Sequence, residues 1–238
     1  MPEVRIAPSS ECADIAARLV LERIHAPDAV IGPATGRSMA ALHARLTDAH
    51  RSGTADLGRA RWLMLDELLD IDPDDPRGYR ATLMRDLLSF AGTRATLIGP
   101  RLELGDVDAI CRDFQVASHG VTPSLQLLGL GRNGHVGFNE PGSLPDSRIR
   151  IADLAESTCA DADPHEWPGH THPRRAITRG VADIADADTI VVLAFGAAKA
   201  DAVRDMLTGA ISPQCPASLL RSHPDLRVLL DGEAARWL

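Results

Sequence analysis

The sequence has few aromatic residues, and this scarcity limits what its surface can recognise. Phenylalanine, tryptophan and tyrosine together make up 3% of the 238 residues. Proteins that hold single-stranded nucleic acids stack the bases on aromatic rings. The chain also lacks an excess of positive charge, because its formal net charge is −8. Nucleic-acid binding requires a basic face, so we expect no nucleic-acid partner.

Cysteines are sparse and far apart in the sequence. The spacings typical of zinc sites and redox pairs are missing among Cys12, Cys111, Cys159 and Cys215. The first residues show no signal-peptide pattern, and no apolar run reaches membrane-spanning length. We therefore expect free thiols, a cytoplasmic location and no membrane partner.

The residues that are present predict an α/β protein. Apolar residues make up 45% of the chain, which is enough for a core. Strand-like apolar runs alternate with segments of helical periodicity. The six runs are residues 29–32, 61–65, 95–98, 125–130, 189–195 and 227–230. This alternation predicts a Rossmann-like three-layer fold, with a mostly parallel central sheet and helices on both faces. We expect a single domain over residues 1–238, with a lid-like loop near 155–175.

The segment at residues 127–143 reads LLGLGRNGHVGFNEPGS. It begins as an apolar run, as a buried strand does, and then breaks into a glycine-dense turn. Glycine lets the backbone approach a ligand closely, and open α/β sheets bind ligands beyond the carboxyl ends of their strands. We therefore expect Asn133, His135 and Glu140 to lie beside a small molecule. The alternative is a tight strand-to-helix turn with a surface histidine.

Another strand-like run, residues 29–32, leads through a polar turn into a helix. The turn contains Thr35, Gly36, Arg37 and Ser38. A helix N-terminus has unpaired amides and positive partial charge, which suits a phosphate group. Glycine permits close approach and the hydroxyls add donors. The turn therefore predicts an anion site, although Ser38 could instead be a helix cap.

Two other strand ends carry charged groups. Asp66 and Glu67 follow the run at 61–65, and adjacent carboxylates beside a buried strand are costly unless they are solvated or used. An isolated pair of this kind is more often a helix cap or a solvated turn. Lys199 stands in the first turn of a helix, where a cation opposes the helix dipole. We expect it to meet an anion, and the alternative is a surface lysine whose cost at this position is small.

Because all these turns follow strands, the predicted fold gathers them at one edge of the sheet. The turn at 35–38 and Lys199 would hold the phosphate of a substrate. Asp66, His135 and Glu140 would lie near its reacting end, where carboxylates and an imidazole move protons. The residues thus indicate an acid/base enzyme that acts on a sugar phosphate without a cofactor.

The segment at 129–143 closely resembles the signature of glucosamine-6-phosphate deaminases. Four further segments resemble landmarks of that family in the same order: residues 32–38, 65–68, 176–178 and 196–200. The resemblance implies a sugar-phosphate substrate that is isomerised with loss of ammonia, and neither a metal nor an organic cofactor. It leaves the oligomeric state open, a homo-oligomer included, and also the preferred sugar epimer, glucosamine or galactosamine.

The resemblance also assigns roles to residues. His135 would be the base that opens the sugar ring, positioned by Asn133 and Glu140. Asp66 would be the base for enolisation, moving a proton between C2 and C1. The phosphate ligands would be Thr35, Gly36, Arg37, Ser38 and Lys199.

The chain departs from the family pattern in places. Asn133 stands where many members carry aspartate, so it can orient the histidine but supplies no charge. The loop 158–173 lacks the expected arginine for the phosphate, which Arg174 or Arg175 would have to replace. Regulated members carry a basic cluster after the central motif. Here Arg150 is followed by Ala152 in place of a lysine, which predicts weak or absent allosteric activation.

Two other functions fit the same residues. A 6-phosphogluconolactonase would share the fold and the phosphate turn, but the Asn-Glu-Pro at 139–141 argues against it. A sugar-phosphate sensor would bind without turnover. The loop also carries His165, His170 and His172 near Glu166, but their spacing matches no zinc signature, so we expect no metal site there.

Overall fold

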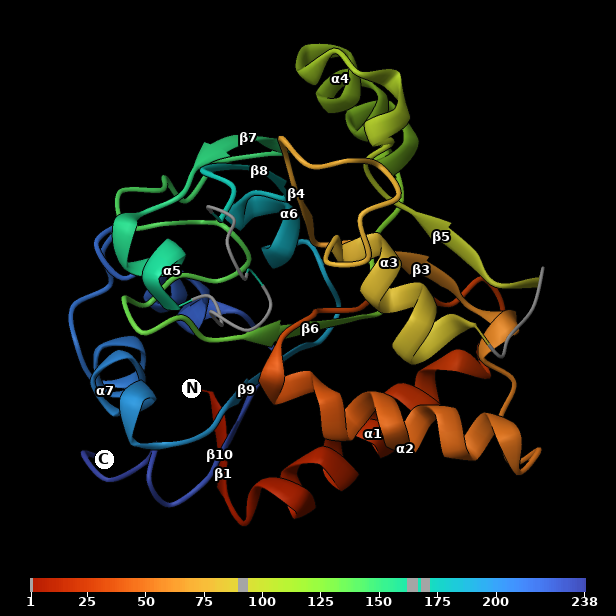
Figure 1. The fold of residues 1–238 in the computed structure, drawn as a ribbon. Coiled ribbons are helices and arrows are strands. Elements are labelled where there is room, and N and C mark those ends of the chain that lie inside the picture. Colours follow the sequence, from red (N-terminus) through yellow and green to blue (C-terminus); the bar gives the residue numbers. More distant parts are fainter. Residues whose placement is uncertain (1, 90–93, 162–166, 168–171) are drawn as a thin grey trace.

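The computed structural model describes residues 2–89, 94–161, 167 and 172–238. Its main sheet has seven strands in the order β1-β10-β9-β6-β2-β3-β5, all paired in parallel (Figure 1). These strands are β1 (Glu3–Ile6), β2 (Val30–Gly32), β3 (Arg61–Leu63), β5 (Thr96–Ile98), β6 (Leu125–Gly129), β9 (Ile190–Ala194) and β10 (Leu226–Leu230). The six predicted strands are all present, and the predicted parallel sheet is confirmed.

Helices surround this sheet as the sequence predicts. The α-helices are α1 (Ser9–Ile24), α2 (Ala40–Arg51), α3 (Tyr79–Leu83), α4 (Val107–Ser118), α5 (Glu156–Asp161), α6 (Val181–Ala185) and α7 (Ala200–Leu207). Short 3₁₀-helices include η1 (Arg37–Met39), η6 (Ala197–Lys199) and η7 (Pro216–Ser222), and a π-helical turn, η3 (Met84–Leu88), continues α3. Helices α1 and α2 pack side by side, whereas α7 packs with η7 elsewhere on the sheet (Figure 1).

A second, smaller sheet was not predicted. It has three antiparallel strands in the order β4-β8-β7, namely β4 (Asp66–Leu68), β8 (Arg175–Thr178) and β7 (Arg150–Asp153). Asp66 pairs with Thr178 across this sheet. The sequence placed Asp66 and Glu67 at the end of a strand, with a helix cap or a solvated turn as the alternative. Both carboxylates lie instead in the buried strand β4, which rules out the solvated turn.

The core explains why the parallel strands are readable from sequence. All five residues of β9 are buried, as expected for a central strand covered on both faces. Strand β1 is different, because all four of its residues are exposed and it lies at the edge of the sheet, beside β10. Within the described residues, none of the helices combines the length and apolarity needed to cross a membrane.

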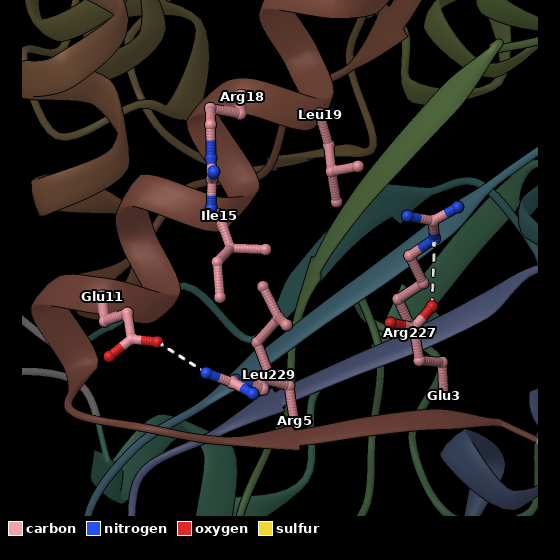
Figure 2. A pocket seen from close by; sticks show the side chains of 8 residues that line it. All are labelled: Glu3, Arg5, Glu11, Ile15, Arg18, Leu19, Arg227 and Leu229. Atoms are coloured by element: carbon pink, nitrogen blue, oxygen red, sulfur yellow. Dashed lines mark hydrogen bonds and ion pairs between the residues drawn. The ribbon is translucent and has the colours of Figure 1, made fainter.

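A small surface pocket of about 270 Å³ lies between α1 and the edge of the sheet formed by β1 and β10 (Figure 2). Its rim carries ion pairs, with Arg5 Nη2 2.9 Å from Glu11 Oε1 and Arg227 Nε 3.8 Å from Glu3 Oε2. None of the residues predicted for the active site lines it. The functional site must be sought elsewhere.

Candidate active site

Apart from Asp66, which lies in β4 of the second sheet, the predicted site residues follow three strands that are neighbours in the main sheet. Strand β6 lies between β9 and β2, with Gly129 beside Leu193 on one side and Gln126 beside Gly32 on the other. Because the strands are parallel, their carboxyl ends point to the same edge. This edge therefore collects residues 127–143, which we call the central segment, and the two turns predicted to bind the phosphate.

The two turns predicted to bind the phosphate have the same local structure. Gly36 precedes η1 with φ of 98°, and Gly196 precedes η6 with φ of 86°. A methyl group added to either glycine would meet nothing within 4 Å. Glycine is therefore required by the left-handed backbone and not by lack of space. Ser38 follows the first glycine by two residues, and Lys199 follows the second by three.

Asn133 links His135 to Glu140 in a short hydrogen-bonded chain. The Oδ1 atom of Asn133 lies 2.8 Å from His135 Nδ1, and its Nδ2 atom donates to Glu140 Oε2 at 2.8 Å. Since an amide oxygen only accepts, Nδ1 of the imidazole carries the proton. Nε2 is then the basic nitrogen of the neutral ring.

Helix α5 completes this chain, which the sequence did not reveal. Thr158 Oγ1 lies 3.3 Å from His135 Nδ1, and Ser157 Oγ accepts from Asn133 Nδ2 at 3.4 Å. Burial alone would raise the pKa of Glu140, but hydrogen bonds from His135, Thr158 and Asn133 outweigh it and lower the pKa to about 2. Glu140 therefore stays ionised and holds the imidazole from one side.

Glycines in the central segment make room for the side chains around them. A methyl group on Gly131 would lie 2.4 Å from the His135 ring, so the ring rests against the backbone there. Gly137 has φ of 55°, and a methyl group on it would lie 3.3 Å from Asp66 Oδ2. The central segment thus reaches Asp66, which comes from the other sheet.

Asp66 lies in β4 and is 7% exposed. Burial, reinforced by the neighbouring charge of Glu67, raises its pKa to about 8. Within the described part of the chain, its carboxylate has no hydrogen-bonding or ion-pair partner in the protein. A base with a raised pKa is suited to take a proton from carbon.

Glu67 has a different task, although it is adjacent in sequence. Its Oε1 accepts from the amide of Tyr79 at 2.7 Å, and its Oε2 accepts from the amide of Arg80 at 2.7 Å. Burial raises its pKa, and these hydrogen bonds oppose the rise. Glu67 therefore caps the N-terminus of α3, so the two carboxylates divide into a helix cap and a group free for chemistry.

Lys199 is half-buried near two arginines. Burial lowers the pKa of its ammonium group, the charge of Asp161 opposes this, and the charges of Arg37 and Arg132 lower it further. Among the described residues, neither Lys199 nor Arg37 has a hydrogen-bonding or ion-pair partner for its side chain. Arg132, which the sequence reasoning did not select, is paired with Asp161.

Two arginines considered in the sequence make other contacts: Arg175, one of the two candidates for the missing phosphate arginine, and Arg150, the arginine of the regulatory cluster. Arg175 donates to Asp70 at 3.0 and 2.6 Å, in an exposed ion pair. Arg150 donates to Asn139 Oδ1 at 2.8 Å and to Ser143 Oγ at 2.9 Å, so its guanidinium braces the end of the central segment. The prediction of weak or absent allosteric activation stays a prediction.

Much of the histidine-bearing loop lies outside the described residues, His165, Glu166 and His170 included. His172 Nδ1 lies 2.7 Å from the carbonyl oxygen of Pro173. The Trp167 ring packs edge-on against His172 with centroids 5.2 Å apart, and the Arg77 guanidinium lies 4.0 Å from its centroid. Over residues 2–89, 94–161, 167 and 172–238, no three side chains of the metal-ligating types converge.

Comparison with known proteins identifies the family to which the chain belongs. The family model for glucosamine-6-phosphate isomerases/6-phosphogluconolactonase matches residues 9–229. The chain belongs to this family. Members of the family named glucosamine-6-phosphate deaminase include one from Arthrobacter sp. (strain FB24), 36% identical over 99% of this chain and 92% of its own length. Another, from Rhodopirellula baltica, is 38% identical over 99% of this chain and 96% of its own length.

Solved structures of the family agree with the fold. A monomeric glucosamine-6-phosphate deaminase superimposes with a TM-score of 0.92 at 33% identity, covering 99% of this chain and 100% of its own. A 6-phosphogluconolactonase from Trypanosoma brucei has a TM-score of 0.82 at 21% identity, covering 100% of this chain and 99% of its own. At that identity the lactonase supports the fold alone.

Proposed function

We propose that this family member is an amino-sugar-6-phosphate deaminase. It converts glucosamine 6-phosphate, or galactosamine 6-phosphate, and water into the ketose 6-phosphate and ammonia. The observation that supports this most is the meeting of two separate bases at one sheet edge. The histidine chain of the central segment and the buried Asp66 approach each other at Gly137.

The two bases suit two different proton transfers. His135, with Nδ1 held by Asn133, takes the proton of the sugar's C1 hydroxyl on Nε2 and passes it to the ring oxygen, which opens the ring. Asp66 then takes the proton from C2 and returns it to C1. Water replaces the nitrogen at C2, and ammonia leaves. Glu140 stabilises the imidazolium formed in the first step.

The turn at 35–38 and Lys199 bind the phosphate in this proposal. Lys199 and Arg37 supply positive charge, and the turn supplies amides and the hydroxyls of Thr35 and Ser38. All four cysteines are free thiols, which supports the proposed cytoplasmic location.

A lactonase does not need a base at carbon, because it only hydrolyses an ester. The raised pKa of Asp66 would then have no use, and we therefore favour the deaminase. The test is to incubate the protein with glucosamine 6-phosphate and galactosamine 6-phosphate separately, without added metal, and to measure ammonium and ketose 6-phosphate. We expect equal amounts of both products from at least one sugar. No ammonium from either sugar, with a folded protein, would refute the proposal, and hydrolysis of 6-phosphogluconolactone in the same preparation would favour the lactonase.

A further inference from the structure

Arg132 belongs to a cluster of three cations that the sheet topology creates. It lies three residues beyond β6, whereas Arg37 and Lys199 follow the neighbouring strands β2 and β9. The three side chains therefore come from adjacent strand ends. The whole chain has a net charge of −8, so this local concentration of positive charge is favourable chiefly in the presence of an anion.

One acid already lies in this cluster. Arg132 Nε donates to Asp161 Oδ2 at 2.7 Å, and its Nη2 contacts Asp161 Oδ1 more closely, so the pair is bidentate. Asp161 is the last residue of α5, the helix whose Thr158 contacts His135. The side chains remain accessible, with 50% of Arg132 and 28% of Asp161 exposed.

A guanidinium binds a carboxylate and a phosphate with the same two-pronged geometry. We propose that Arg132 is a ligand of the substrate's phosphate, and that Asp161 competes with the phosphate for the Arg132 guanidinium. Arg132 would then supply the arginine that the sequence of the lid lacks. The identity of the ligand as a sugar phosphate rests on the proposed function, but the competition between two anions does not.

A purely structural ion pair would behave differently. If the pair only fixed α5, removing either partner would have the same effect on ligand binding. If Asp161 competes, removing Arg132 weakens phosphate binding whereas neutralising Asp161 strengthens it. Opposite signs from the two halves of one ion pair are thus the signature of the proposal.

The experiment measures the affinity of the full-length protein for inorganic phosphate by calorimetry, and the KM for glucosamine 6-phosphate. For Arg132→Gln we expect about 10- to 100-fold weaker phosphate binding, as for the loss of a charged hydrogen-bonded pair. For Asp161→Asn we expect about two- to five-fold tighter binding, the scale of an exposed ion pair. Both KM values should move in the same directions.

The matched controls are Arg101→Gln and Asp113→Asn. Arg101 and Asp113 form a bidentate ion pair of similar exposure, 52% and 24%. Neither residue belongs to the cluster of Arg37, Arg132 and Lys199. Both controls should leave phosphate affinity unchanged. Equal weakening in Arg132→Gln and Asp161→Asn, or no change in either, would overturn the inference. The expected phosphate pattern without ammonium release would instead refute the proposed function and leave this inference standing.

Discussion

The buried carboxyl of Asp66 makes stability depend on pH in a way that a neutral side chain would remove. Its pKa is raised from 3.8 to about 8, mainly by burial. In the unfolded chain it ionises at the ordinary value, so between these two pKa values the folded protein holds one proton more. The free energy of unfolding therefore falls as the pH rises through this window, and the fall ends above the folded pKa.

The size of the change in unfolding free energy follows from the distance between the unfolded and folded pKa values of Asp66. One extra proton in the folded state costs about 1.4 kcal/mol per pH unit. Between pH 4 and pH 7 the loss reaches about 4 kcal/mol, a large part of the roughly 5–15 kcal/mol that stabilises a domain. Asp66→Asn preserves the shape of the side chain but cannot ionise. Its stability relative to the wild type should rise by about 4 kcal/mol over that range.

The assay is urea unfolding of both proteins, followed by circular dichroism, at pH values from 4 to 9. Ammonium release is measured in parallel, and we expect Asp66→Asn to lower kcat by about 100-fold or more because the enolisation base is lost. Asp74→Asn is the control, since this aspartate is exposed and lies in the loop that follows β4. Parallel stability curves for wild type and Asp66→Asn between pH 4 and pH 8 would refute the reasoning, whatever the effect on activity.

Two further substitutions test the surroundings of the bases. Glu67→Gln removes the like charge beside Asp66, and this removal lowers the pKa of Asp66. The acid limb of the pH profile of kcat/KM should therefore move to lower pH. An unmoved limb would show that Asp66 does not control the acid limb. Gly131→Ala places a methyl group where the His135 ring lies, and we expect kcat to fall about 100-fold, measured as ammonium release. Gly129→Ala adds a methyl group that meets nothing within 4 Å, and it should keep full activity.

The fold was readable from sequence wherever burial is complete. Runs such as residues 190–194 are apolar throughout because the central strands are covered on both faces. Strand β1 was missed because it has only four residues, two of them charged, and all four are exposed. Strands β4 and β8 are short, and β4 begins with two carboxylates whose burial depends on partners far away in the chain.

The site was readable where its parts are close in sequence. Asn133, His135 and Glu140 lie within eight residues, and the structure brings them into one hydrogen-bonded chain. The contacts from α5 were not readable, because they join residues more than twenty positions apart. The different tasks of Asp66 and Glu67 depend on which amides come within reach, and a sequence does not reveal that.

The scarcity of aromatic residues has a practical consequence at Trp167. The chain contains three tryptophans. Trp62 is fully buried, with its indole N–H bonded to the carbonyl of Leu57, and Trp237 lies exposed at the C-terminal end. Among contacts between described residues, Trp167 alone of the three has both a histidine and a cation against its ring. Its fluorescence is therefore an intrinsic optical reporter of the contacts with His172 and Arg77, and Trp237→Phe would remove most of the competing signal from solvent-exposed indole.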